Sequence, residues 1–163
     1  MDVFVSSTYR DLAEYREVLR VALTTSGHTF HGMEHFAANP TPPLETCMAA
    51  LERCNVYVGL IGGLYGSSPP GRRLSYTELE YRRAMDRDMY TIILLLDDDA
   101  TIRQSLVERD PVRFGRLERF KSIIRQRHTV QTFRDPHEAA WKILAALRVY
   151  EVALREREGM DSL

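Results

Sequence analysis

The sequence predicts an α/β protein: a flavodoxin-like, three-layer sandwich with a five-stranded, mostly parallel sheet. Strand-like and helical segments alternate five times along the 163 residues, as parallel strands joined by crossover helices require. Three of the strand-like segments, residues 1–6, 56–61 and 90–96, are apolar runs in which polar residues do not alternate with apolar ones. Such runs are typical of strands that helices cover on both faces.

The remaining elements follow from apolar spacing and end signals. Residues 11–26 carry apolar side chains at helical spacing from Leu12 to Leu23, and Gly27 is a typical stop after a helix. Asp135, Pro136 and Glu138 form a capping box that starts a long final helix. The other predicted elements are a weak strand over 28–34, a helix from 42 to about 53, a helix over 75–87, two helices over 101–110 and 113–126 separated by Pro111, and a strand over 129–133.

Composition limits what the chain can be. We expect one domain over residues 1–155, followed by a polar tail over 156–163 that could lead into a further module. The formal net charge of -1 gives no basic surface for nucleic acid, and no apolar stretch approaches the roughly 20 residues that span a membrane. Two cysteines and no signal peptide indicate a reduced, cytoplasmic protein.

Several familiar sites are missing from the sequence. There is no phosphate-binding P-loop motif and no dinucleotide fingerprint after the first strand. His28 and His31 would point to opposite faces of one strand, so we expect no metal site there. Cys47 and Cys54 are expected to face the core instead of acting as reactive thiols.

Ligands of such folds bind at the carboxyl ends of the strands. After the first strand, Ser6, Ser7 and Thr8 with nearby Arg10 could hold a phosphate at the start of a helix. After the third strand, the loop over 62–73 is rich in glycine and proline and is expected to be mobile. Its glycines, Gly62, Gly63 and Gly66, could let the backbone approach a ligand, and Tyr65 could stack on a base. A turn without a ligand would explain the same glycines equally well.

The helix over 75–87 contains an unusual carboxylate. Ser75 and Glu78 form a capping box, so Glu78 is expected to have a structural role in which its carboxylate reaches back to the Ser75 amide. Glu80 lies roughly 200° around the helix from Glu78 and shares a stripe with Tyr76 and Ala84, the stripe expected to face the sheet. A carboxylate there breaks the apolar pattern, as residues at functional sites often do. The alternative is that Glu80 pairs with a neighbouring arginine, Arg83 or Arg87, at the surface.

Four ordered motifs resemble the DUF4062 family, a TIR-like domain of the wider TIR superfamily. They are VFVSSTYRDL, GMEHF, CNVYVGLIGGLYG and SYTELEYRRA, and together they cover roughly residues 2–96. The resemblance implies the TIR-like version of the predicted fold. It also implies an N-terminal position in larger signalling NTPases, the STAND type, which would be a fused or separate partner.

The resemblance further implies a chemistry. Enzymatic TIR domains cleave NAD⁺ with one glutamate in their third helix, and Tyr76, Glu80 and Ala84 match the spacing of that motif. Glu80 is therefore the expected catalytic residue. The expected substrate-binding residues are Ser6, Ser7, Thr8, Arg10, Glu34, Gly62, Gly63, Tyr65, Gly66 and Tyr76. NAD⁺ would be the substrate, and no cofactor is expected.

Two other functions remain open on the sequence. The chain could be a catalytically silent TIR-like module that acts by self-association, because fold does not fix function. It could also bind or process another nucleotide, since nothing in the sequence selects the base. If the chain instead cleaves NAD⁺, it would act as an NAD⁺ nucleosidase in a bacterial immune or conflict signalling system.

Overall fold

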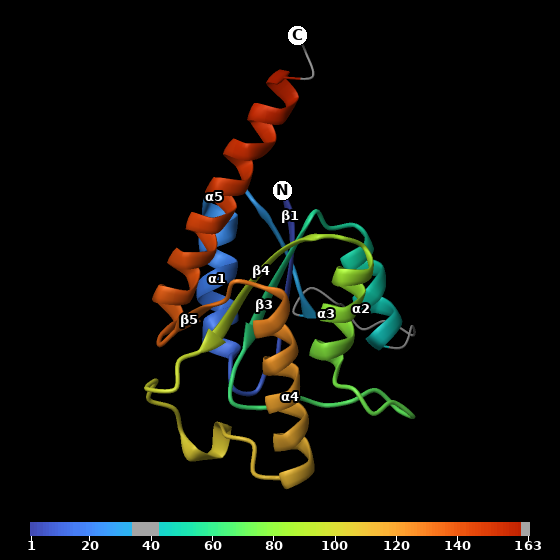
Figure 1. Ribbon diagram of the computed structural model, residues 1–163. Helices are drawn as coiled ribbons and strands as arrows, with labels where there is room; N and C mark the ends of the chain where they lie inside the picture. Colours follow the sequence, from blue (N-terminus) through green and yellow to red (C-terminus); the bar gives the residue numbers. More distant parts are fainter. Residues whose placement is uncertain (34–42, 161–163) are drawn as a thin grey trace.

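The computed structural model describes residues 1–33 and 43–160, and it contains one five-stranded sheet in which all the strands are parallel (Figure 1). The strand order is β2-β1-β3-β4-β5. The strands are β1 (Asp2–Ser7), β2 (Thr29–His31), β3 (Val56–Ile61), β4 (Tyr90–Leu96) and β5 (Gln131–Phe133). The predicted fold class is confirmed.

Helices cover both faces of the sheet. Helices α1 (Ala13–Thr25) and α5 (Pro136–Met160) lie together on one face. On the opposite face lie α2 (Pro43–Glu52), α3 (Tyr76–Asp86) and α4 (Pro111–Arg127) (Figure 1). The order of strands places β1 and β3 side by side at the centre, so the loops after these two strands meet at one edge of the sheet.

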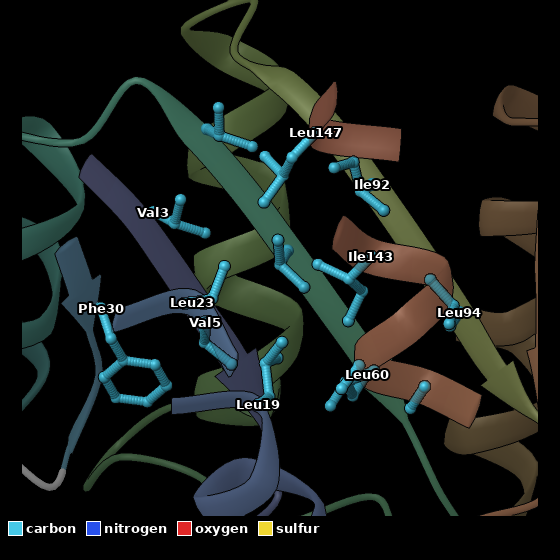
Figure 2. Close-up of a cluster of buried hydrophobic side chains, with 14 of the residues drawn as sticks. Val3, Val5, Leu19, Leu23, Phe30, Leu60, Ile92, Leu94, Ile143 and Leu147 are labelled. Carbon is cyan, nitrogen blue, oxygen red and sulfur yellow. The ribbon is translucent and has the colours of Figure 1, made fainter. Parts of the chain in front are cut away.

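Alternate residues of each central strand enter two separate cores. Figure 2 shows the core beneath α1 and α5, where Val3 and Val5 of β1 meet leucines of both helices. Phe4 of β1 and Tyr57 of β3 point to the other core, beneath α2, α3 and α4. By the same alternation, Ser6 faces α3. A polar side chain therefore enters an otherwise apolar face at the carboxyl end of β1.

The predicted helix over 101–110 is wrong. In that segment the structure has only a short 3₁₀ turn, η2 (Gln104–Leu106). Asp110 instead caps α4, since its carboxylate accepts a hydrogen bond from the Arg113 amide at 2.8 Å, and Pro111 occupies the first turn. Proline is favourable there because its missing N–H would have no helical partner. Pro111 thus begins a helix and does not interrupt one.

The C-terminal helix extends beyond residue 155, where the domain is expected to end. Its start is as predicted, with Asp135 accepting hydrogen bonds from the amides of His137 and Glu138 at 2.9 Å each. The helix then continues to Met160, so the described part of the expected polar tail is helical. In the described chain, no helix is long and apolar enough to cross a membrane.

Candidate functional site

Glu80 lies inside the protein, against the carboxyl end of β1. Its side chain projects from α3, is 3% exposed, and its Oε2 accepts a hydrogen bond of 2.5 Å from the Ser6 hydroxyl. The surface alternative is wrong, because Arg83 and Arg87 both pair with Glu52 of α2 instead. Helix α3 therefore turns Glu80 toward the sheet, as its stripe with Tyr76 and Ala84 predicted.

Burial changes the acidity of Glu80. Desolvation raises the pKa of the Glu80 carboxyl to about 7, against the lowering effects of the Ser6 hydrogen bond, the Arg16 charge and the Cys47 thiol. The ordinary pKa of a glutamate is far lower, so a fully solvated Glu80 would be ionised at neutral pH. In this site the charged and neutral forms coexist near pH 7, which is the range in which a carboxylate can exchange protons during catalysis.

The surroundings of Glu80 are built by a glycine in β3. Ser6 is the register partner of Gly59, which lies within the apolar run of that strand. A side chain at Gly59 would come within 3.1 Å of the Tyr57 ring and 3.4 Å of its hydroxyl. The Tyr57 hydroxyl therefore lies over the bare backbone of Gly59 and near Ser6, and it is buried with no hydrogen-bond partner of good geometry among the described residues. Sequence reasoning missed this pair, although a glycine inside a buried strand often marks a close approach.

Cys47 of α2 completes the polar group around Glu80. Its thiol is fully buried, and burial together with the nearby Glu80 charge raises the pKa of Cys47 to about 12. The thiol consequently stays protonated and unreactive at neutral pH. The expectation that Cys47 and Cys54 face the core is confirmed, since both are buried and free.

Glu78 has a structural role, but its expected partner is wrong. The Ser75 hydroxyl accepts from the Glu78 amide at 3.2 Å, as a capping box requires. The Glu78 carboxylate does not return to the Ser75 amide. Instead, the Tyr65 hydroxyl accepts from that amide at 3.3 Å and donates to Glu78 Oε2 at 2.7 Å. Arg82 and Arg119 balance the buried charge of Glu78.

Tyr65 consequently keeps its ring inside the protein. It is 2% exposed, and its hydroxyl is occupied in the cap of α3. Stacking on a base would require this buried ring to be uncovered, so the stacking role stays a prediction.

Gly62 and Gly63 pack closely against other parts of the protein. The amides of Gly63 and Leu64 donate to Asp11 Oδ2 at 2.9 and 3.1 Å, and Asp11 also accepts from the Thr8 hydroxyl. A side chain at Gly62 would collide with Asp11, and one at Gly63 with the Leu106 carbonyl. These contacts hold the first part of the loop against the segment before α1 and against η2, while the mobility of the loop stays a prediction. Gly62 and Gly63 are needed for that close packing.

A cavity of about 520 Å³ opens beside this cluster, between the loops after β1 and β3 and the start of α3. Its volume suits a nucleotide-sized ligand. Five of the predicted binding residues line it: Ser7, Thr8, Arg10, Gly66 and Tyr76. Ser6, Gly62, Gly63, Tyr65 and Glu80 do not. Glu34 lies outside the described residues.

Sequence reasoning missed other parts of the cavity wall. Tyr9 and Met33 are exposed apolar residues on its rim, while Glu108 and Arg113 come from the segment before and within α4. Arg113 donates to the Gly66 carbonyl at 2.6 Å and pairs with Glu108 at 3.4 Å. No sequence signal connects these distant segments. Arg10 is exposed and has no hydrogen-bond or ion-pair partner among the described residues, so it is the cation available to a ligand.

Ser7 and Thr8 use their hydroxyls within the protein. Ser7 Oγ accepts from Arg16 at 2.9 Å and donates to the Thr8 carbonyl at 3.0 Å. Arg16, buried on α1, also donates to the Val5 carbonyl at 3.2 Å. These contacts fix the end of β1, and with it the position of Ser6 beneath the cavity wall.

The comparisons with known proteins agree with this architecture. Residues 2–148 match the family described as a domain of unknown function, DUF4062. A search of curated proteins found no match. Among solved structures, the chain is similar to the TIR domains in the structure of the activated Roq1 resistosome directly recognizing the pathogen effector XopQ. The TM-score is 0.65 at 15% identity, over 90% of this chain and 98% of that chain. Since the family match spans most of the sequence, the chain belongs to the DUF4062 family, and its fold is that of a TIR domain.

Proposed function

We propose that this domain cleaves the N-glycosidic bond of NAD⁺ and releases nicotinamide, with Glu80 as the catalytic carboxylate. The observation that supports this most directly is Glu80 itself: a buried carboxylate at the strand ends with a pKa near 7, next to a nucleotide-sized cavity. The TIR-like fold adds support at the level of the fold alone.

The chemistry needs one carboxylate. The bond between the ribose C1′ and the nicotinamide nitrogen breaks, and its electron pair leaves with the base. Nicotinamide is cationic in NAD⁺ and leaves as a neutral base, so no acid is required to protonate it, unlike in ordinary glycoside hydrolysis. The charged form of Glu80 would stabilise the positive charge that develops on the ribose. Water then adds to C1′ and loses a proton, which gives ADP-ribose.

The cavity offers groups for the rest of the substrate. The guanidinium of Arg10, which has no partner within residues 1–33 and 43–160, suits a phosphate because charge-assisted hydrogen bonds are strong. Tyr9 and Tyr76 line the same cavity and present rings on which a base can stack. None of these contacts selects nicotinamide over another base, so other nucleotides belong in the test.

Glu80 itself does not line the cavity. Its neighbours do: Ser7 follows Ser6 in β1, and Tyr76 precedes Glu80 by one turn of α3. The Glu80 carboxylate thus lies behind the residues that line the cavity. We propose that contact between neighbouring copies, gathered by a fused or separate STAND-type NTPase in bacterial defence signalling, opens this wall. The similar TIR domains come from an activated resistosome.

The same observation favours a second candidate function. If Glu80 stays behind the wall, the domain would be a catalytically silent module that signals by self-association. The two functions differ in one measurable respect, which is whether assembled domains turn over NAD⁺.

The experiment measures free nicotinamide by chromatography after incubation with NAD⁺. The domain is assayed over a wide range of concentration and also when fused to an oligomerising partner. The proposal expects turnover per molecule to rise with assembly and to vanish in Glu80→Gln. Asp86→Asn removes an exposed carboxylate from the same helix and should retain activity. No turnover by the oligomerised domain with Glu80 intact would favour the silent module, and the same samples test other nucleotides.

A further inference from the structure

The hydroxyl of Ser6 is the one hydrogen-bond donor described at 2.5 Å from the candidate catalytic carboxylate, and it comes from the central strand β1. Ser6 is 1% exposed and lies outside the lining of the cavity. A substrate in that cavity would therefore meet Ser7 and Thr8, and not Ser6. The expected role of Ser6 in phosphate binding does not fit this position.

The backbone at Ser6 is held by contacts on both sides. Its register partner across β3 is Gly59, and the adjoining Ser7 is held by Arg16 of α1. A side chain in place of Gly59 would crowd the Tyr57 ring, so the space above the strand exists only because β3 has a glycine there. The Ser6 and Tyr57 hydroxyls thus lie close together above these two strands, and α3 directs the Glu80 carboxylate toward them.

The groups that face Glu80 come from every element packed around it. They are Ser6 of β1, Arg16 of α1, Cys47 of α2 and Tyr57 of β3. Arg16 acts on Glu80 through its charge, and the Cys47 thiol is a weak donor. The Ser6 hydroxyl is a neutral donor at 2.5 Å from the Glu80 carboxylate, and it comes from a central strand, so it can fix where the carboxylate oxygens lie.

We propose that Ser6 is a positioning residue for Glu80: its hydroxyl holds the carboxylate at a fixed place behind the cavity wall and stabilises the ionised form that the reaction uses. This inference rests on the proposed function for its catalytic meaning. The hydrogen bond itself, and its effect on ionisation, can be measured without any substrate.

The first measurement is the titration of Glu80 in the free domain by carboxyl ¹³C NMR, with the signal assigned by its loss in Glu80→Gln. Ser6→Ala should raise the pKa of Glu80 by about one unit, because a hydrogen bond to an ionised group is lost. Two controls keep the site intact. Ser122→Ala removes an exposed hydroxyl from α4, and Tyr81→Phe removes a buried hydroxyl bonded to His128. Neither should move the titration.

The second measurement is the pH profile of nicotinamide release. With its pKa raised by one unit, Ser6→Ala should show kcat about fivefold below the unmodified domain at pH 7 and nearly equal to it at pH 9. KM should not change, since Ser6 does not line the cavity. A phosphate-binding Ser6 would instead raise KM at every pH, and that result would overturn the proposal.

The two proposals fail in different ways. If Ser6→Ala leaves the titration of Glu80 where it was, the positioning role is wrong, whatever the turnover. If the pKa rises but the pH profile of kcat does not follow it, the role in catalysis is wrong. If the assembled domain releases no nicotinamide at any pH, the proposed function fails, while the titration still reports whether Ser6 stabilises the ionised Glu80.

Discussion

Ser6 of β1 is paired with Gly59 of β3, and the carboxylate of Glu80 reaches the sheet at this pair. An ordinary parallel sheet would have two large apolar side chains there. The chain has a serine and a glycine, which leave room for a carboxylate that burial makes costly to ionise. A buried acid that stability does not require is the kind of residue that function retains.

Glu80→Gln should stabilise the domain at alkaline pH. The folded-state pKa of about 7 lies above the unfolded value of 4.5, so the folded protein binds the proton more tightly. Stability from this group is full below the unfolded pKa and is lost as pH rises through the folded pKa. A glutamine keeps an acceptor for Ser6 and has no proton to lose. We expect the difference in unfolding free energy between variant and unmodified domain to grow by about 2–3 kcal/mol from pH 5 to pH 8.

Urea titrations of both proteins at the two pH values measure this difference, and charges elsewhere cancel in the comparison. Asp86→Asn serves as the control, with no pH-dependent difference expected. A constant difference between the two pH values would mean that Glu80 is ionised in the folded protein at both.

Gly59→Ala should destabilise the fold. The added methyl would lie 3.1 Å from the Tyr57 ring and 3.5 Å from Ile93, both within a packed core. We expect a cost of about 1–3 kcal/mol, as for other overpacked cores. Gly115→Ala is the matched control, because no atom lies within 4 Å of a side chain there and the position is helical. It should be neutral or stabilising, and thermal unfolding of both variants checks the contrast.

Tyr65→Phe should lower stability and leave nucleotide binding unchanged. The variant removes the hydroxyl that links the Ser75 amide to Glu78, which leaves a buried donor without a partner at a cost of about 1–3 kcal/mol. Since the ring does not line the cavity, KM should stay constant. Chemical denaturation measures the loss of stability, and steady-state kinetics measure KM. A raised KM at unchanged stability would support the stacking role that the sequence suggested.

The fold could be predicted from the sequence because each central strand is a continuous apolar run and each helix has a recognisable face or cap. Glu80 could also be predicted, since one carboxylate on an apolar helical stripe is a local pattern. The cavity could not. Its wall brings Thr8, Gly66 and Arg113 together from three segments, and the Arg113 contact with the Gly66 carbonyl has no counterpart in local spacing.

The partners of loop residues could not be predicted for the same reason. The sequence predicts ligand contacts for Tyr65, Gly62 and Gly63 because they follow a strand end, where ligands usually bind. Their partners, Glu78 and Asp11, are charged residues whose side chains turn inward, and sequence spacing does not show the direction of a side chain in a loop. The helix predicted to end at Asp110, before Pro111, is wrong for a simpler reason. The same dipeptide can end one helix or begin another, and the packing of α4 decides which.

Arg10→Ala should weaken substrate binding without affecting the fold. Arg10 is exposed on the cavity wall and has no partner among the described residues, so its loss breaks no internal contact. A guanidinium that holds a phosphate contributes a charge-assisted hydrogen bond, and we expect KM for NAD⁺ to rise about 10- to 100-fold. The unfolding free energy should stay within about 0.5 kcal/mol of the unmodified value.

Arg155→Ala, at the far end of α5, is the matched control for a lost surface charge and should change neither KM nor the unfolding free energy. Raising the salt concentration should weaken binding by the unmodified domain more than by the variant, because screening acts on the charge that the variant lacks. Equal KM values for the two proteins at low salt would place the phosphate elsewhere in the cavity, with Arg113 the remaining cation on its wall.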